Sequence, residues 1–351
     1  MSGEFVSAHD HFEAVRKEWD NLNRFQGDHI LLDSEFTGAL LRHFGSEAVR
    51  LGILQDSKRP AMVLVVPTRW GFWETFQPSQ APMGLGVFAY RDEKGDSLLE
   101  LLRSLPGYPL QLAVLQQDPD FSAFPMNRER SHFEFIEYIR TGSLKLNGSF
   151  EEYWNSRSED LKRNNARRRR KLAEQNQKLE FAANTDRDSV AARVREYGRL
   201  ESQGWKGREG TAVTQDNAQG RFYREVMEIF CERGEGVIFE MLLEGTPIAS
   251  EFWIGRNGMY VNLKTAYDEN LKQLSPGFLM KESLIRWAFS EKSWQRLEFY
   301  GRKMDWHQKW IDRTRTLYHV NCYRSRWILE ARKMANRLRS FRTGASTHQP
   351  D

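Results

Sequence analysis

Residues 259–290 contain the side chains whose types and spacing could do chemistry. An apolar run predicted as a strand, residues 258–265, leads into a loop that ends at Ser275, Pro276 and Gly277, where a helical pattern begins at once. Serine is a good helix N-cap, proline is accepted in the first helical turn, and glycine allows close approach of the backbone. The first N–H groups of a helix lack internal partners and lie at the positive end of its dipole, so this junction could bind phosphate. Helix starts without a ligand show the same pattern, and the local sequence leaves both interpretations open.

Candidate acid and base groups lie on either side of this junction. Glu251 belongs to the preceding predicted strand, residues 247–254, and Asp268 follows the strand at 258–265. Either carboxylate could take the proton that an amine must lose when it is acylated. Apolar neighbours of Glu251 would disfavour its charged form if the side chain is buried. Tyr300, at the end of a predicted strand at 296–300, is a candidate for protonating a leaving thiolate.

The two cysteines do not form a recognisable site. Cys231 and Cys322 are 91 positions apart, which gives neither a disulfide framework nor a zinc motif. Cys231 lies in an amphipathic stretch, and we expect it to be a small buried apolar residue. No metal is expected.

The elements around these residues occur in two similar series. Each series has helices, then antiparallel strands, then a helix and a further strand, which is the order of an α/β unit. No residue identity accompanies the repeat, so it is a repeat of pattern. The first series comprises a helical first 25 residues, strands at 49–55 and 61–68, a loop at 77–85, a helix at 97–105 and a strand at 110–116; the second comprises helices at 190–202 and 220–233, strands at 237–243, 247–254 and 258–265, a helix at 278–290 and a strand at 296–300.

The net charge of +4 hides two basic segments. Residues 157–171 carry eight Lys or Arg against two acids, and residues 322–343 carry seven against one, so the remainder has a net charge of −8. The first segment is predicted to lie in one helix over 149–178 that starts with a Ser149–Glu152 capping box. Both segments could be solvated faces or could bind an anionic partner, either RNA or a membrane surface.

The composition is that of a globular protein, with 40% hydrophobic and 28% charged residues among 351. No run approaches the roughly 18–20 apolar residues of a membrane span. The first residues lack the basic-then-apolar order of a signal peptide, so we expect a cytoplasmic protein.

Three stretches resemble the GNAT superfamily of N-acyltransferases, and in particular the branch named after the cellulose-biosynthesis protein CelD. They are Gly204-Trp205-Lys206-Gly207-Arg208 with Gly210-Thr211-Ala212, then Lys264-Thr265-Ala266-Tyr267-Asp268 with Ser275-Pro276-Gly277, then Gly301 with Trp310. Their order and spacing agree from residue 204 to residue 310, whereas the first half of the chain matches in general layout only.

The resemblance implies a mixed α/β (α+β) fold of two tandem GNAT-like domains, each a mostly antiparallel sheet flanked by helices, joined by a long basic helix. The implied division is a degenerate GNAT-like domain at 1–148, the basic connector helix at 149–183, the acyltransferase domain at 184–321, and a basic helix and tail at 322–351.

The resemblance also implies the site and its co-substrate, acetyl-CoA or another acyl-CoA. The pantetheine arm would pair with a splayed strand at 260–266, and the pyrophosphate would lie on the following loop and helix start. The implied cofactor-binding residues are Leu263, Lys264, Thr265, Ala266, Ser275, Pro276, Gly277, Phe278 and Leu279, and the acceptor-side residues are Trp205, Lys206, Arg208 and Tyr267. Where the branch commonly has Tyr-Lys, this chain has Trp306-His307, so His307 is a candidate additional base.

The sequence therefore predicts acyl transfer to an amine, such as an amino sugar or amino-acid derivative, small or carrier-linked, in polysaccharide or cell-envelope metabolism. One alternative is an aminoacyl-tRNA-dependent peptidyltransferase resembling the FemA/FemX family, and another is a non-catalytic GNAT-like scaffold. The sequence gives no indication of oligomeric state.

Overall fold

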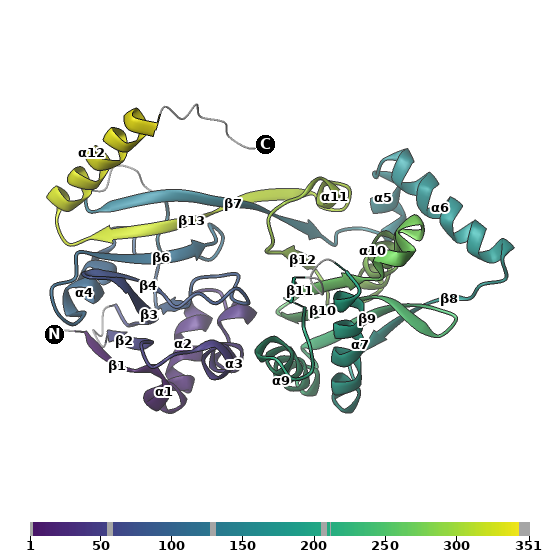
Figure 1. The fold of residues 1–351 in the computed structure, drawn as a ribbon, viewed down its shortest axis with the longest axis horizontal. Helices are drawn as coiled ribbons and strands as arrows, with labels where there is room; N and C mark the ends of the chain where they lie inside the picture. The colour runs from purple at the N-terminus through teal and green to yellow at the C-terminus, as the bar shows by residue number, and fades with distance from the viewer. Residues whose placement is uncertain (1–2, 55–58, 127–130, 205–208, 211, 344–351) are drawn as a thin grey trace.

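A single mixed sheet runs through the whole molecule (Figure 1). The structure is a computed structural model that describes residues 3–54, 59–126, 131–204, 209–210 and 212–343. In spatial order the strands are β1 (Glu4–Ser7), β2 (Arg50–Leu54), β3 (Ala61–Arg69), β4 (Phe72–Thr75), β6 (Gln111–Gln117), β13 (Arg313–Tyr323), β7 (Phe133–Lys145), β12 (Arg296–Phe299), β11 (Met259–Tyr267), β10 (Thr246–Arg256), β9 (Gly236–Leu243) and β8 (Leu179–Asn184), with β5 (Gly86–Phe88) paired to β3.

Two parallel pairs interrupt this otherwise antiparallel sheet, one in each half of the chain. They are β4 with β6 and β11 with β12. A helix connects the two strands of each pair, α4 (Asp96–Ser104) in the first half and α10 (Pro276–Ser290) in the second. The repeat predicted from the sequence pattern is therefore confirmed as two similar arrangements of strands and helices.

The last strand of each half joins the sheet of the other half. β7 pairs with β12 of the second half, and β13, which follows that half in the chain, pairs with β6 of the first. β7 and β13 also pair with each other along most of their length. Figure 1 shows these two long strands bridging the halves.

Amphipathic helices cover one face of the sheet and build a core shared by both halves. They are α2 (Arg16–Phe25), α3 (Ser34–Phe44), α7 (Val190–Ser202) and α9 (Ala218–Glu232), with α1 (Ala8–His11) beside them. On α9, Phe222, Val226 and Phe230 recur every four residues and are fully buried. The ring of Phe222 meets that of Phe36 of α3 edge to face, with centroids 5.6 Å apart. Cys231 is buried there as expected, and burial raises the pKa of its thiol to about 12.

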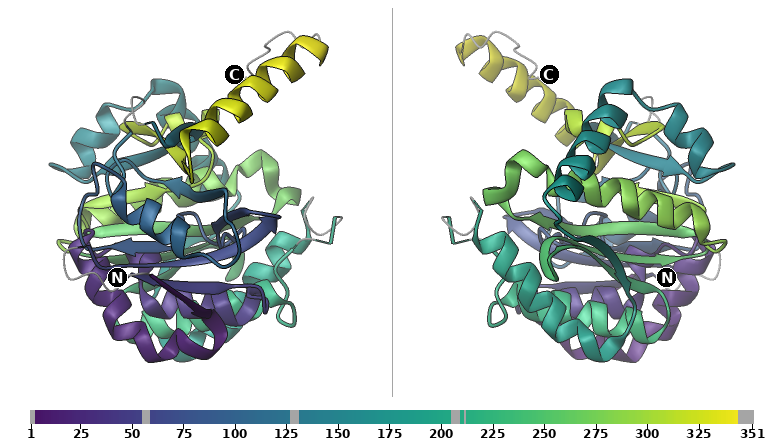
Figure 2. Two further views of the ribbon diagram at one scale, coloured as in Figure 1. Left: turned by 90° about the vertical axis from the view of Figure 1, so that its left-hand side faces the viewer. Right: turned by 90° about the vertical axis from the view of Figure 1, so that its right-hand side faces the viewer.

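The opposite face carries α10, α5 (Phe150–Asn155) and α6 (Glu159–Glu174) over the second half and α4 over the first (Figures 1 and 2). The chain ends with α11 (Asp305–Gln308), β13 and α12 (Arg326–Thr343). None of the helices described is both long enough and apolar enough to cross a bilayer.

The single helix predicted over residues 149–178 is wrong. The predicted capping box of Ser149 and Glu152 is present and starts α5, but that helix ends at Asn155. Ser158 then caps a second helix, α6, by accepting a hydrogen bond from the backbone N–H of Leu161. The segment beyond α6 forms β8, which the sequence analysis did not predict.

In the first half, the parallel strands β4 and β6 diverge after a short paired stretch, and a loop of the chain fills the gap between them. β4 and β6 pair only from Phe72 to Glu74, and the loop at 76–85 follows at the point where they diverge. The backbone N–H of Leu115 donates to Thr75 Oγ1 at 3.0 Å, and that of Gly84 donates to Gln116 O at 3.4 Å. A Cβ at Gly84 would lie 2.1 Å from Leu115 O, so the loop fits tightly in this gap.

Candidate active site

In the second half, the parallel strands β11 and β12 diverge in the same way, starting part-way along β11. β11 pairs with β12 only over Met259–Val261, although β11 continues to Tyr267. On its other edge, β11 changes register against β10 between Phe252 and Trp253, which leaves Leu263 as the extra residue of a β-bulge. The described part of the sheet therefore provides no strand partner for the β12-facing edge of β11 beyond Val261.

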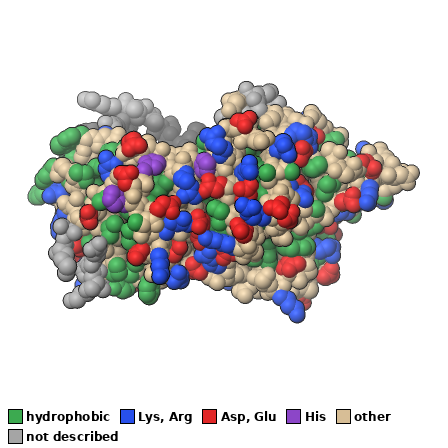
Figure 3. All heavy atoms as spheres, turned by 90° about the horizontal axis from the view of Figure 1, so that it is seen from below, with side chains coloured by type: hydrophobic (Ala, Val, Ile, Leu, Met, Phe, Trp, Pro, Cys, Tyr) green, Lys and Arg blue, Asp and Glu red, His purple; other side chains and the backbone are tan. Residues whose placement is uncertain are grey.

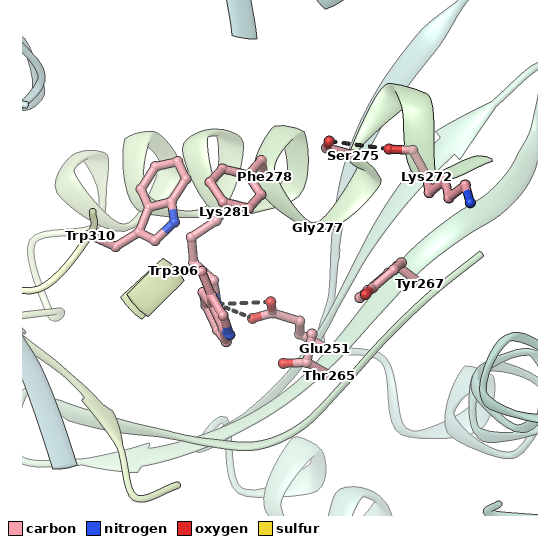
Figure 4. A pocket seen from close by; sticks show the side chains of 10 residues that line it. All are labelled: Glu251, Thr265, Tyr267, Lys272, Ser275, Gly277, Phe278, Lys281, Trp306 and Trp310. Carbon is pink, nitrogen blue, oxygen red and sulfur yellow. Dashed lines mark hydrogen bonds and ion pairs between the residues drawn. The ribbon is translucent and has the colours of Figure 1, made fainter. Parts of the chain in front are cut away.

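A cavity of about 230 Å³ lies between this end of β11, the start of α10 and the segment that follows β12 (Figure 4). Most of its wall surface is apolar, and aromatic rings alternate with a few charged or hydroxyl side chains. The lining residues are Glu251, Thr265, Tyr267, Lys272, Ser275, Gly277, Phe278, Lys281, Trp306 and Trp310. We call this cavity the α10 pocket.

A buried ion pair lies in the α10 pocket. The side chain of Glu251 is buried, and Lys281 Nζ from α10 lies 2.8 Å from each of its carboxylate oxygens. Trp253 Nε1 donates to Glu251 Oε2 at 2.8 Å, and Asn262 Nδ2 donates to it at 3.3 Å. The carboxylate is thus paired with an ammonium group, whereas the sequence analysis considered only its apolar neighbours.

Lys281 itself was missed by the sequence analysis. Its sequence signal is a lysine four positions after Gly277, within the apolar face of α10 that also carries Leu284 and Ala288. A charged residue at a core position of an amphipathic helix indicates a buried partner, because an unpaired buried charge is strongly destabilising.

The start of α10 forms the mouth of the pocket. Ser275 has a left-handed backbone, with φ 45° and ψ 63°, and its side chain makes no capping bond to α10. Gly277 faces open space, since a Cβ there would meet only the Tyr267 ring, at 3.6 Å. In Figure 4, Ser275, Gly277 and Tyr267 surround the opening.

Positive charge gathers around this mouth. Lys272 lines the pocket, Lys309 Nζ lies 5.3 Å from the centre of the Phe278 ring, and Arg168 Cζ of α6 lies 6.0 Å from the same ring. Helix α6 is held against α10 by Asn165, whose Nδ2 donates to Phe278 O at 3.3 Å and to Glu282 Oε2 at 2.9 Å. The basic helix predicted from the sequence therefore lies directly beside the pocket.

His307 stands beside the pocket as a neutral imidazole. Its ring stacks on that of Trp306 with centroids 3.7 Å apart, and its Nδ1 accepts a hydrogen bond from Met304 N at 2.9 Å. Burial, followed by the nearby Lys281 ammonium, lowers the pKa of His307 to about 4. Its Nε2 therefore carries the hydrogen at neutral pH.

Like His307, the other two candidate catalytic residues, Asp268 and Tyr300, do not line the pocket. The carboxylate of Asp268 accepts from Asn270 N at 2.9 Å and caps the 3-10 helix Glu269–Leu274. The Tyr300 hydroxyl donates to Asp118 Oδ2 at 2.7 Å and lies 2.7 Å from His29 Nε2. Burial, together with the Asp118 carboxylate, raises the pKa of Tyr300.

The remaining candidates divide between the two faces of the sheet. Thr265 and Tyr267 line the α10 pocket and also a smaller cavity of about 80 Å³ on the opposite side, beside α7. Ala266 lines only the smaller cavity, together with Glu201 and Glu269. Lys264 Nζ lies 3.4 Å from Glu201 Oε1.

Three further candidate residues belong to the hydrophobic cores rather than to the pocket walls. Leu279 and Pro276 are buried at the start of α10, and Leu263 packs partly buried against the core on the α7 face. The acceptor-side candidates Trp205, Lys206 and Arg208 fall outside the described residues.

Comparison with known families and structures agrees with this architecture. Residues 161–308 match the family model described as an acetyltransferase (GNAT) domain. No curated protein matches the chain in sequence.

Several solved structures are similar to the chain in fold. One is the C-terminal domain (DUF2156) of a protein from Agrobacterium fabrum described as a lysylphosphatidylglycerol synthetase, with 10% identity, 88% of this chain and 92% of that chain covered, and a TM-score of 0.52. The structure of FemX has 10% identity, with 92% of this chain and 97% of that chain covered, and a TM-score of 0.46. A tandem GNAT protein from the clavulanic acid biosynthesis pathway has 12% identity, with 91% of this chain and 98% of that chain covered, and a TM-score of 0.46.

The similarity to a GNAT acetyltransferase domain is to residues 161–308, largely within the second half of the chain. The chain has a mixed α/β fold of two tandem GNAT-like halves, each with a splayed parallel pair of strands. The family model and this fold together support the GNAT superfamily.

Proposed function

We propose that the second half of this chain is an N-acyltransferase that takes an acyl group, acetyl in the simplest case, from acyl-CoA and transfers it to an amine. The observation that carries this proposal is the open splay of β11 and β12 beside the start of α10, with a buried carboxylate in the adjoining pocket. The filled gap of the first half supports a single site in the second half.

The residues around the α10 pocket fit an acyl-CoA. The β11 edge beyond Val261 offers backbone N–H and C=O groups to the amides of a pantetheine arm. The first turn of α10 and the cations Lys272, Lys309 and Arg168 offer positive potential to phosphates. When bound, acyl-CoA would supply the thioester carbonyl carbon that the amine attacks.

The proposed chemistry assigns the proton of the amine to Glu251. Glu251 first takes one proton from the ammonium, directly or through one water, which leaves the neutral amine that attacks the thioester carbon. As the C–N bond forms and the C–S bond breaks, the nitrogen loses its second proton, and one proton returns to the leaving sulfur to give the free thiol. Lys281 holds the carboxylate in place, with its Nζ 2.8 Å from each carboxylate oxygen. Backbone N–H groups at the bulge around Leu263 are the candidates for stabilising charge on the carbonyl oxygen.

The smaller cavity beside α7 is the proposed acceptor side. Glu201, which is paired with Lys264, and Glu269 border this cavity and would offer polar contacts to an amine acceptor, such as an amino sugar or an amino-acid derivative. The resemblance to the CelD branch favours an acceptor from polysaccharide or cell-envelope metabolism, free or linked to a carrier.

Turnover tests this proposal. We expect a screen of amines with acetyl-CoA to release free thiol, and Glu251→Gln to lower the rate at least about tenfold through loss of the base. Asp268→Asn is the matched control, because Asp268 caps a turn outside the pocket, and its rate should stay within about twofold of wild type. If folded Glu251→Gln, checked by circular dichroism, keeps the wild-type rate, Glu251 is not the base.

A second candidate function rests on the position of α6. Its cations Arg167, Arg170 and Lys171 are exposed, and the helix packs beside the pocket mouth. A basic surface of this kind could hold the phosphates of an aminoacyl-tRNA in place of CoA. Filter binding with charged tRNA distinguishes the two donors, and a folded protein that binds neither donor would support the non-catalytic scaffold.

A further inference from the structure

Exposed aromatic and basic side chains gather at one end of the first half, remote in the fold from α10. We call this surface the aromatic end and define it by Trp70, Tyr108 and Trp327 with Arg69, Arg324 and Arg326. Trp70 and Tyr108 line one shallow cavity, and the Arg324 guanidinium stacks on the Tyr108 ring at 4.4 Å. Trp327 lies three positions after Arg324, in the first turn of α12.

The sheet register brings these segments together. Gln111, the first residue of β6, pairs with Phe72 at the start of β4 and with Tyr323 at the end of β13. The turn before β4, the loop before β6 and the start of α12 therefore meet at the same edge. Gly71, with φ 73°, provides the tight turn that presents Trp70.

The aromatic side chains of this surface are unusually open to solvent. Trp70 is 79% exposed, Tyr108 60% and Trp327 84%. Large aromatic groups gathered on a surface indicate a binding site, since isolated exposed apolar residues need no partner but a cluster does. Figure 3, a view from below, shows positive and negative side chains mixed over the middle of that face.

The charge of this surface has one sign. Residues 67–73, 106–110 and 324–329 contain three arginines and no acidic residue, whereas the chain without its two basic segments has a net charge of −8. In both views of Figure 2, α12 extends away from the body, and Trp327 in its first turn is exposed.

We propose that the aromatic end docks the protein on the surface of an anionic lipid bilayer. Trp and Tyr rings favour the boundary between headgroups and acyl chains, and arginine pairs with lipid phosphates. The other basic segment, on α6 in the second half, would also be attracted to anionic lipid, but that helix has no such cluster of exposed rings, so the aromatic side chains set the orientation with this end toward the lipid. The α10 pocket, in the other half, stays open.

Vesicle cosedimentation tests this inference without reference to catalysis. We expect the full chain to pellet with vesicles of equal parts phosphatidylcholine and phosphatidylglycerol, and much less with phosphatidylcholine alone. Trp70→Ala combined with Trp327→Ala should weaken binding to the anionic vesicles at least about tenfold, and added salt should weaken it further.

Phe25→Ala is the matched control, because Phe25 is 74% exposed and lies on α2, outside the aromatic end. Binding by the double variant equal to that of wild type, or no pelleting of folded wild type with either vesicle, would overturn the inference. Dimerisation that the double variant abolishes in sedimentation velocity would instead assign the surface to a second copy of the chain and would also overturn it.

Discussion

The pairing of Glu251 with Lys281 explains how a carboxylate can be kept in the interior of the second half. Both side chains are buried, and the Lys281 ammonium also lies 4.9 Å from the centre of the Phe299 ring and 5.3 Å from that of Trp253. Removal of one partner from such a pair leaves an uncompensated charge, which destabilises a protein by about 3–5 kcal/mol. Each partner is therefore needed to compensate the buried charge of the other, beside the proposed proton transfer.

A double-mutant cycle tests this pairing. Lys281→Met and Glu251→Gln should each lower the free energy of unfolding in urea by about 3 kcal/mol, and the double variant should lose at least about 1 kcal/mol less than their sum. Arg163→Met is the control, because Arg163 and Asp160 form an exposed pair whose loss should change stability by less than about 1 kcal/mol. Strict additivity of the two buried substitutions would contradict a coupled pair.

Residue-level prediction from the sequence was incomplete for a physical reason. Glu251, Thr265, Tyr267, Ser275, Gly277 and Phe278 were all candidates, and the structure places them around one pocket. The partner of Asp268 is local, a turn N–H two residues away, and the preference of Asp for such turns could have indicated it. The partners of Tyr300 were not predictable from local sequence, because they include Asp118 from the first half.

The two splayed strand pairs distinguish the halves at the scale of elements. Both halves have the same parallel pair and crossing helix, but a loop fills one gap and a pocket adjoins the other. One glycine beside each strand pair shows the difference between the filled gap and the open pocket. Gly84 is pressed against the backbone of Leu115, whereas Gly277 has only ordinary contact with Tyr267.

Alanine substitution at each glycine tests this contrast. Gly84→Ala should lower stability by at least about 2 kcal/mol, because a Cβ 2.1 Å from a carbonyl oxygen forces the backbone to move. Gly277→Ala should leave stability unchanged or raise it by up to about 1 kcal/mol, since alanine favours a helix. Thermal unfolding measures both, and a Gly84→Ala variant as stable as wild type would show that the loop does not fill the gap.

Sequence periodicity predicted most elements but not all of them. The strands at β3, β9, β10 and β11 and the helices α7, α9 and α10 follow from apolar spacing. β7 and β13 were missed, and their exchange between halves depends on pairing between residues far apart in the chain, such as Phe133 and Cys322. A single sequence carries no signal for such long-range pairing.

At the scale of the whole molecule, a buried polar network reinforces the exchanged strands. His29 Nδ1 accepts from Leu31 N, so its Nε2 carries the hydrogen that is donated to the Tyr300 oxygen. Tyr300 donates in turn to Asp118, which also pairs with Arg315 of β13. This network joins residues of both halves and of the last strand.

The pH dependence of stability tests the network. Burial lowers the pKa of His29 to about 3. The nearby Asp118 carboxylate has the opposite, smaller effect on this pKa. Unfolded histidine titrates near 6.5, so the unfolded state binds more protons below that pH, and stability falls as pH decreases from about 6.5 toward 3.

We therefore expect the stability advantage of wild type over His29→Gln to shrink by about 1.4 kcal/mol per pH unit below pH 6.5 in urea titrations. His11→Gln serves as the control because His11 is exposed. A pH-independent difference for His29→Gln would show that the imidazole does not stay neutral in the folded state.

Calorimetric titration with acetyl-CoA tests most directly whether the open splay is an acyl-CoA site. The account predicts binding in the micromolar to millimolar range for wild type, as is usual for enzyme substrates. Gly277→Ala should bind within about threefold of wild type, and Gly277→Trp, which fills the mouth beside Tyr267, should bind at least about tenfold more weakly. Folded wild type that binds neither acetyl-CoA nor CoA, or Gly277→Trp that binds as wild type does, would contradict the account.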